Sequence, residues 1–100
     1  MAKKRALMLS PKDNVASVME EVLSGDDVVA QGGIETLLLR AVDKIPFGFK
    51  VATVDIRQGD PVIKYGEVIG RASNNIQKGT LVHIHNIEGA RGRGDLQKNR

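Results

Sequence analysis

The sequence predicts a small, mainly β domain with one or two short helices. Beyond residue 45, short apolar segments alternate with Gly, Pro and Asp about every ten residues, a pattern typical of strands joined by tight turns. Two segments of this half, 55–62 and 75–82, also share one order: Asp or Asn, Ile, two polar residues, Gly, two further residues and Val. Because Gly accepts a positive φ, each copy predicts a tight turn between two strands. The pair therefore favours a pseudo-symmetric β fold in which two similar turns clasp each other.

The first part of the chain predicts a strand followed by a helix. The apolar run at 6–9 predicts the strand. Apolar residues then recur at helical spacing over 15–23, with Asp13 or Asn14 as N-cap and Ser24-Gly25 as the stop. This spacing predicts one amphipathic helix.

The later elements are predicted to be strands and turns. Residues 28–30 predict a short strand, and 36–42 a further strand that is rich enough in Leu to form a helix instead. The segment 61–67 predicts a hairpin with its turn at Gly66. Because none of them lies in a nucleotide-binding frame, four further glycines are interpreted as turn residues: Gly48, Gly59, Gly70 and Gly79.

Size and composition indicate a single domain that works with a partner. One hundred residues fit one folding unit, and with one Tyr, two Phe and no Trp its core must be aliphatic. Such a domain buries only a moderate share of its surface, so we expect a larger neighbour to stabilise it, or a homo-oligomer to form when it is isolated. The domain is predicted at 1–88, followed by a basic, Gly-rich flexible tail at 89–100.

The composition favours a cytoplasmic protein with no nucleic-acid and no membrane partner. The net charge of +3 comes from the two ends of the chain, without the exposed aromatic residues or basic helix that a nucleic-acid binder normally carries. Having no cysteine, the chain lacks disulfides and thiolate metal sites, as is usual in a reducing compartment. No run approaches the roughly 18 apolar residues of a membrane span, and the apolar run near the N-terminus is too short for a signal peptide.

Both histidines of the chain lie in one motif, His83-Ile84-His85-Asn86. On a strand, positions i and i+2 face the same side, so the two imidazoles would point together. Two imidazoles do not complete a metal site, which needs a third ligand or a chelating substrate. The motif leaves two interpretations open: an active-site edge with His85 and Asn86 nearest a partner, or a polar strand edge without chemistry.

Cationic side chains near the predicted hairpin form a second candidate site. Lys64 and Arg71 could each bind a substrate carboxylate, Arg71 through its two-pronged guanidinium. In the structural alternative, Lys64 pairs with Glu67 and Tyr65 covers a sheet edge. The residues alone leave both interpretations of Lys64 open.

The sequence resembles the SAF (β-clip) domain of the altronate and galactarate dehydratase family. The resemblance covers about residues 8–87. It is carried by Asp13-Asn14-Val15-Ala16 and by the runs IPFGFKVATVDI at 45–56, GDPVIKYGEVIGRA at 59–72 and VHIHN at 82–86. The resemblance implies a β-clip fold. In this family the domain precedes a much larger catalytic domain or occurs as a separate small subunit, and we expect this chain to be such a small subunit, capping the active site of a large catalytic dehydratase subunit.

In such a lyase, water leaves a hydroxylated carboxylic acid such as altronate or galactarate. This elimination needs a base, an electrophile that stabilises the enediolate, and an acid for the leaving group. The usual electrophile is a divalent cation, here Fe²⁺, Mn²⁺ or Mg²⁺, expected to be held mainly by the large subunit. The resemblance favours an active-site position for at least one histidine, so we expect catalytic roles for His85 and His83, which are also candidate metal ligands. The expected contacts with the hydroxy acid come from Asn86, Lys64 and Arg71. The small subunit alone is expected to be inactive.

Two alternatives remain open at this point. After Asn86 the sequence becomes basic and Gly-rich, unlike the sugar-acid dehydratases, and Arg91 or Arg93 could bind a second anionic group. This departure favours the small subunit of a sulfolactate sulfo-lyase, a carbon-sulfur lyase whose leaving group is sulfite. The other alternative is a non-catalytic SAF module that binds carbohydrate or protein.

Overall fold

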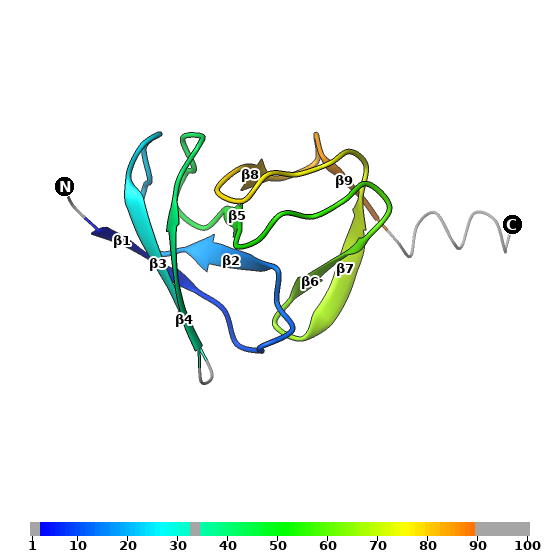
Figure 1. The fold of residues 1–100 in the computed structure, drawn as a ribbon, viewed down its shortest axis with the longest axis horizontal. Coiled ribbons are helices and arrows are strands. Elements are labelled where there is room, and N and C mark those ends of the chain that lie inside the picture. Colours follow the sequence, from blue (N-terminus) through cyan, green and yellow to red (C-terminus); the bar gives the residue numbers. More distant parts are fainter. Residues whose placement is uncertain (1–2, 33–34, 90–100) are drawn as a thin grey trace, which may run out of the picture.

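The computed structural model describes residues 3–32 and 35–89, and within them it contains strands and turns but no helix. The described part of the chain therefore has no helix long and apolar enough to cross a membrane. The strands, shown in Figure 1, are β1 Lys3–Leu7, β2 Val15–Val18, β3 Asp27–Gly32, β4 Glu35–Arg40, β5 Lys50–Ala52, β6 Pro61–Lys64, β7 Glu67–Ala72, β8 Leu81–Val82 and β9 Ile87–Glu88.

The strands form two sheets. The larger has the order β4-β3-β1-β2-β5-β8, with β1 and β3 parallel and the other neighbours antiparallel. The smaller has the order β6-β7-β9 and is antiparallel. In Figure 1, β1, β3 and β4 lie at one end of the molecule, β6, β7 and β9 at the other, and β2 and β5 between them. The curled sheets confirm the predicted mainly β, β-clip architecture.

The amphipathic helix predicted over 15–23 is wrong, because its first residues form β2. All four residues of β2 are buried. Ala16 and Val18 face one hydrophobic core, whereas Val15 belongs to the other. A strand buried on both faces lacks the polar-apolar alternation of a half-exposed strand, so its sequence is easily mistaken for a helical face. The ambiguous segment at 36–42 is a strand, β4, over most of its length.

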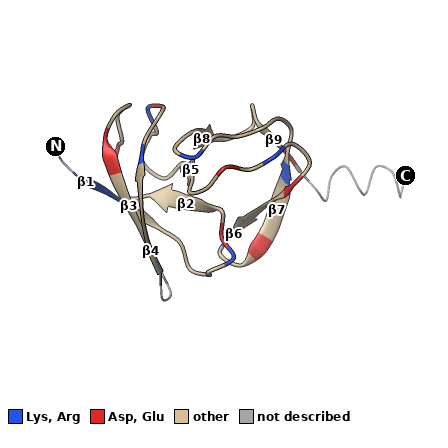
Figure 2. Cartoon of the chain, viewed as in Figure 1, with Lys and Arg blue, Asp and Glu red and all other residues tan. Residues whose placement is uncertain are grey.

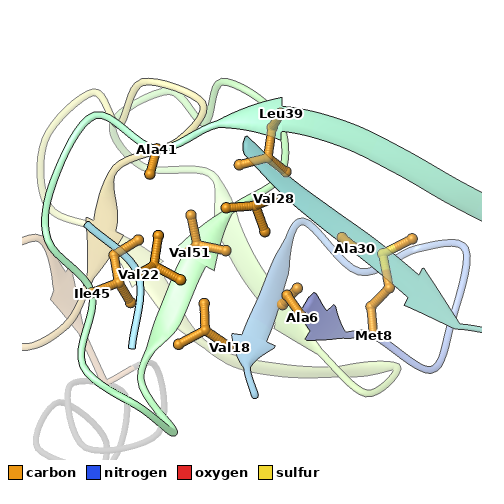
Figure 3. Close-up of a cluster of buried hydrophobic side chains, with 11 residues drawn as sticks. Ala6, Met8, Val18, Val22, Val28, Ala30, Leu39, Ala41, Ile45 and Val51 are labelled. Atoms are coloured by element: carbon orange, nitrogen blue, oxygen red, sulfur yellow. The ribbon is translucent and has the colours of Figure 1, made fainter. Parts of the chain in front are cut away.

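Two cores fill the space beside β2. The larger one, shown in Figure 3, is aliphatic as predicted and collects side chains from β1, β2, β3, β4 and β5 and from the loops near Val22 and Ile45. The smaller one lies toward the β6–β7 hairpin and includes Val62, Ile56 and Ile76. Because β2 contributes to both cores, it joins the two halves of the domain.

The predicted pair of clasping turns exists, and the structure contains two more copies of it. Four segments have the pattern Val or Ile, two residues, Gly, two residues, Val: 22–28, 45–51, 56–62 and 76–82. We call them the first to fourth clip copies, and the tight turn in each a clip turn. Their glycines have φ between 86° and 93°. In every copy the backbone N–H of the residue after Gly donates to the carbonyl of the residue three positions earlier, which is the first residue of the turn. This is the hydrogen bond of a type II turn. The first copy is bridged to the second, Val22 to Ile45, and the third to the fourth, Ile56 to Ile76.

Three of the four predicted turn glycines are confirmed, and Gly70 is not. Gly48, Gly59 and Gly79 lie in the repeated turns with positive φ. Gly70 lies instead within β7, where a Cβ atom would meet the carbonyl oxygen of Glu88 at 2.4 Å. Here the small residue is required by the close approach of β9 and not by backbone conformation.

Asp13 and Asn14 fasten the β6–β7 hairpin to the segment between β1 and β2. The Asp13 carboxylate accepts hydrogen bonds from the backbone N–H groups of Leu9 and Ser10 and, at 2.7 Å, of Gly66. The Asn14 amide accepts from the N–H of Ile63 and donates to the carbonyl of Pro61. The predicted N-cap residues thus organise a loop and a hairpin and cap no helix.

Asp13 should make the fold sensitive to acid. Burial acts to raise the pKa of this carboxyl, but hydrogen bonds from the backbone of Gly66, Leu9, Ser10 and Tyr65 together outweigh it and hold the pKa below its ordinary value. A lowered pKa gives stability that is present above the unfolded value of about 3.9 and lost as pH falls through the folded value.

Asp13→Asn is therefore expected to lower the free energy of unfolding at pH 7, and the gap to the wild type should narrow toward pH 3. Urea denaturation of both proteins at pH 7 and at pH 3 measures this difference in the free energy of unfolding. Glu20 and Asp26, whose pKa values are also lowered by hydrogen bonds to backbone N–H groups, are unchanged in both proteins and cancel in the comparison. A gap of equal size at both pH values would contradict the proposed charge dependence.

Candidate functional site

The motif at 83–86 forms a turn and not the predicted strand, since β8 ends at Val82. The N–H groups of Asn86 and Ile87 both donate to the carbonyl of His83. The side chain of Asn86 is 6% exposed, and its amide accepts from the N–H of His83 and donates to the carbonyl of Leu81, both at 2.9 Å. Asn86 thus shapes the turn that carries the histidines, whereas its contact with a substrate stays a prediction.

The two histidines have different surroundings. The imidazole of His83 is half-buried and packs against Phe49, with ring centroids 4.8 Å apart. His85 is exposed and follows Ile84, whose side chain is 81% exposed. Because both lie in a turn, strand alternation does not align their side chains. The outermost part of this turn, Ile84 and His85, is the part best placed to meet another surface.

The described residues offer no ready-made metal centre. No group of three or more His, Cys, Asp or Glu side chains comes together within 3–32 and 35–89. To hold a cation, His83 and His85 would need further ligands from outside the described residues. Their role as ligands, like the cation itself, stays a prediction.

The predicted hairpin turn is confirmed, and it holds Lys64 and Tyr65 in defined positions. Tyr65 and Gly66 have φ of 53° and 81°, as a two-residue type I′ turn requires. The Tyr65 hydroxyl donates to the hydroxyl oxygen of Ser17 at 3.2 Å, across to β2. The ammonium group of Lys64 lies 5.1 Å from the centroid of the Tyr65 ring. No ion pair joins Lys64 to Glu67 within the described part of the chain, so the structural pairing is absent there.

Lys50 is a candidate site residue that the sequence interpretation missed. It lies opposite Ser17 in the β2–β5 pair and is half-buried. Burial lowers the pKa of its ammonium group, and the nearby positive charge of Lys64 lowers it further. One sequence feature could have identified Lys50: it is a lysine within the apolar run of the second clip copy, directly before Val51 and Ala52.

Arg71 lies apart from the other predicted cation. It pairs in register with Pro61, whereas Lys64 pairs with Glu67, so the two are at opposite ends of the hairpin, about 10 Å apart along β6. Its guanidinium donates to the carbonyl of Gly59 at 3.2 Å and is otherwise exposed. Arg91 and Arg93, and the predicted tail apart from Gly89, lie outside the described residues.

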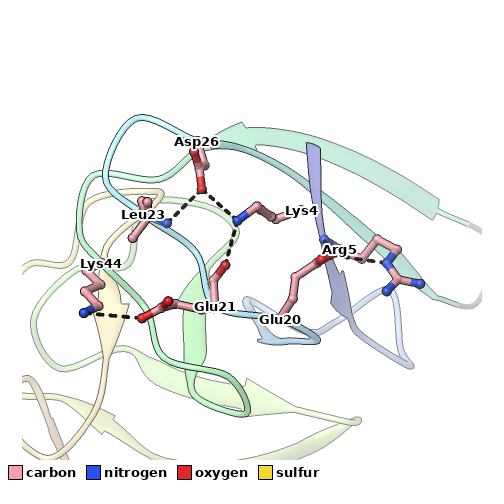
Figure 4. Close-up of polar contacts among 7 residues, drawn as sticks. All are labelled: Lys4, Arg5, Glu20, Glu21, Leu23, Asp26 and Lys44. Atoms are coloured by element: carbon pink, nitrogen blue, oxygen red, sulfur yellow. Dashed lines mark hydrogen bonds and ion pairs between the residues drawn. The ribbon is translucent and has the colours of Figure 1, made fainter. Parts of the chain in front are cut away.

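The charges of the described residues are balanced and dispersed. Figure 2 shows Lys and Arg interspersed with Asp and Glu over the ribbon. The basic N-terminal residues are engaged, as Figure 4 shows: Lys4 pairs with Asp26 at 3.2 Å and Arg5 with Glu20 at 3.3 Å. These contacts attach β1 to the first clip turn through Asp26 and to the segment before that turn through Glu20, so Lys4 and Arg5 belong to the folded domain.

Three hollows on the described surface lie away from the candidate residues. One is lined by Lys3, Asp27 and Arg40 with neighbouring leucines, a second by residues on both sides of the Ile56–Ile76 bridge, and a third by residues that include Val42 and Lys78. Neither His85 nor Lys64 lines any of these three hollows.

Comparison with known proteins gives one family and two kinds of relative. Residues 4–90 match the altronate/galactarate dehydratase SAF domain. The chain is 31% identical to altronate dehydratase of Bacillus subtilis over 85 residues, which are 85% of this chain and 16% of that enzyme. It is 42% identical to the (2R)-sulfolactate sulfo-lyase subunit alpha of Chromohalobacter salexigens over 53 residues, 53% of this chain and 56% of that subunit. A second such subunit, from Paracoccus pantotrophus, is 44% identical over 50 residues, 50% of this chain and 75% of that subunit.

Proposed function

The chain belongs to the SAF-domain family of altronate and galactarate dehydratases, and we propose that it acts as the small subunit of a lyase. In this proposal it caps the active site of a large catalytic subunit that removes water from a hydroxylated carboxylic acid such as altronate or galactarate. The observation that carries the proposal is the family match over residues 4–90. It is supported by relatives in which the matching region is either a small fraction of a long dehydratase or much of a separate alpha subunit.

In the proposed reaction the chain contributes surface groups to a centre built by its partner. His85 is exposed at the tip of its turn, and an imidazole is a common general acid or base in catalysis. Lys64 is proposed to bind the substrate carboxylate, with Arg71 and Asn86 as further candidate contacts. A divalent cation held mainly by the large subunit would stabilise the enediolate. The chain alone is proposed to be inactive, because it lacks a complete set of these groups among its described residues.

A second candidate is the small subunit of a sulfolactate sulfo-lyase. Two relatives of this kind are more than 40% identical to the chain over about half of its length. The same surface would then bind a sulfonate as well as a carboxylate. Turnover of sulfolactate in preference to sugar acids by the reconstituted complex would favour this candidate.

The proposed contact surface can be located by hydrogen exchange. When a large catalytic subunit binds, backbone amides of residues 80–89 should exchange more slowly, because a domain that caps an active site places its active groups at the contact. The amides of β1 and β3, which lie at the other end of the molecule in Figure 1, serve as the internal reference. Protection confined to that other end would rule out the capping arrangement.

A further inference from the structure

We propose that Lys50 and Lys64, together with the hydroxyl groups of Tyr65 and Ser17, form a binding site for one oxyanion group of a small acid. The anion's identity as part of the lyase substrate rests on the proposed function, whereas the site itself rests on the geometry of the chain. Its chemistry suits a carboxylate or a sulfonate.

The sheet register and two side-chain contacts connect the four residues, of which Ser17 is buried and Lys50 half-buried. Ser17 and Lys50 are directly opposite in the antiparallel β2–β5 pair, so their side chains emerge on the same face. The Tyr65 hydroxyl reaches that face by donating to Ser17 at 3.2 Å. Lys64 lies beside this phenol, with its ammonium group 5.1 Å from the centroid of the Tyr65 ring, and is close enough to Lys50 for its charge to act on that ammonium group.

Within residues 3–32 and 35–89, neither ammonium group forms an ion pair with a carboxylate. The four ion pairs found among the described residues use other cations: Lys4, Arg5, Arg40 and Lys44. Burial lowers the pKa of Lys50, and repulsion by Lys64 lowers it further. Holding two like charges together in a partly desolvated place costs free energy, which a bound anion would offset.

The hydroxyl groups supply the directional part of the site. Because the Ser17 oxygen accepts the hydrogen of Tyr65, the hydrogen of Ser17 itself remains available to donate. An oxyanion placed between the lysines could therefore accept two charge-assisted hydrogen bonds and one from a hydroxyl. Tyr65 and the hairpin turn hold Lys64 in place, so the site is formed before a ligand arrives.

The test uses NMR spectra of the ¹⁵N-labelled 100-residue chain without any partner. It is titrated separately with sodium acetate and sodium methanesulfonate, with sodium chloride keeping the ionic strength constant. We expect saturable shifts of the amide signals of Ser17, Lys50 and Lys64 at millimolar concentration. Lys50→Met and Lys64→Met should each weaken binding about tenfold or more, the loss of one charge-assisted hydrogen bond. The anion with the lower dissociation constant shows whether the site prefers a carboxylate or a sulfonate.

Lys78→Met, which removes an exposed lysine in the fourth clip copy, is the matched control and should bind like the wild type. A direct titration of the Lys50 side chain adds a second measurement: its pKa should rise in Lys64→Met, because the repulsion is gone. Shifts that do not saturate, or full-strength binding by both lysine variants, would overturn the proposal. Since no partner or turnover is involved, failure here leaves the lyase function standing, and failure of the lyase function leaves this site standing.

Discussion

Gly79→Ala is expected to remove at least about 3 kcal/mol of stability, a large part of the 5–15 kcal/mol that is usual for a small domain. Gly79 has φ of 91°, which costs an L-residue about 1–2 kcal/mol. A Cβ atom there would also lie 2.2 Å from the carbonyl oxygen of Arg40. Backbone cannot yield as a flexible side chain can, so the fourth clip turn would have to move away from β4.

Gly59→Ala is the matched control for this prediction. Gly59 occupies the equivalent position in the third copy with φ of 90°, but nothing lies within 4 Å of its added Cβ. The Gly59→Ala variant should lose only the stability that the positive φ costs an L-residue, about 1–2 kcal/mol. Urea denaturation of both variants measures the difference. Equal losses would show that the close approach to Arg40 does not matter.

His85→Ala should leave the fold intact and lower the turnover of the reconstituted lyase by roughly 10²-fold, the effect of losing a general acid-base group. The side chain is exposed in the 83–86 turn and makes no hydrogen bond within the described part of the chain. Its removal should therefore change the free energy of unfolding by less than about 0.5 kcal/mol. Thermal unfolding of the purified variant and steady-state kinetics of its complex measure the two effects.

His83→Ala separates chemistry from packing. Its imidazole packs against Phe49, so this variant should lose about 0.5–1.5 kcal/mol of stability. The metal content of each complex shows whether an imidazole acts as a ligand or as a proton carrier. If both variants keep near-normal turnover and unfold earlier, the histidines are structural and the chemistry belongs to the large subunit.

The β class, the hairpin at Gly66 and the clasp of Ile56 with Ile76 could all be predicted from the sequence, because Gly, Pro and Asp mark tight turns locally. The first half was harder to predict. There the first two clip copies share only their Val or Ile, Gly and Val positions, and the residues between them, such as Ser24, Asp26 and Phe47, differ. Their similarity was recognised only when the structure showed that they form the same turn. The helix was predicted in error because β2 is buried on both faces.

The candidate site was only partly predictable for a similar reason. Lys64 and the histidines belong to compact motifs, whereas Lys50 and Ser17 join the site through the register of β2 with β5, residues 33 positions apart. No local sequence pattern predicts the pairing of β2 with β5. Asn86 shows the opposite case, since its motif indicates a functional residue but its amide is engaged by its own turn.

The turnover of a large catalytic subunit with and without the chain tests the proposed small-subunit role most directly. Purified dehydratase and sulfo-lyase large subunits would each be assayed on altronate, galactarate and (2R)-sulfolactate, alone and mixed with the 100-residue chain. The proposed role predicts turnover of one of these acids by the mixture and none by the chain alone. Turnover by the pure chain, or a large subunit whose full activity is unchanged when the chain is added, would contradict it.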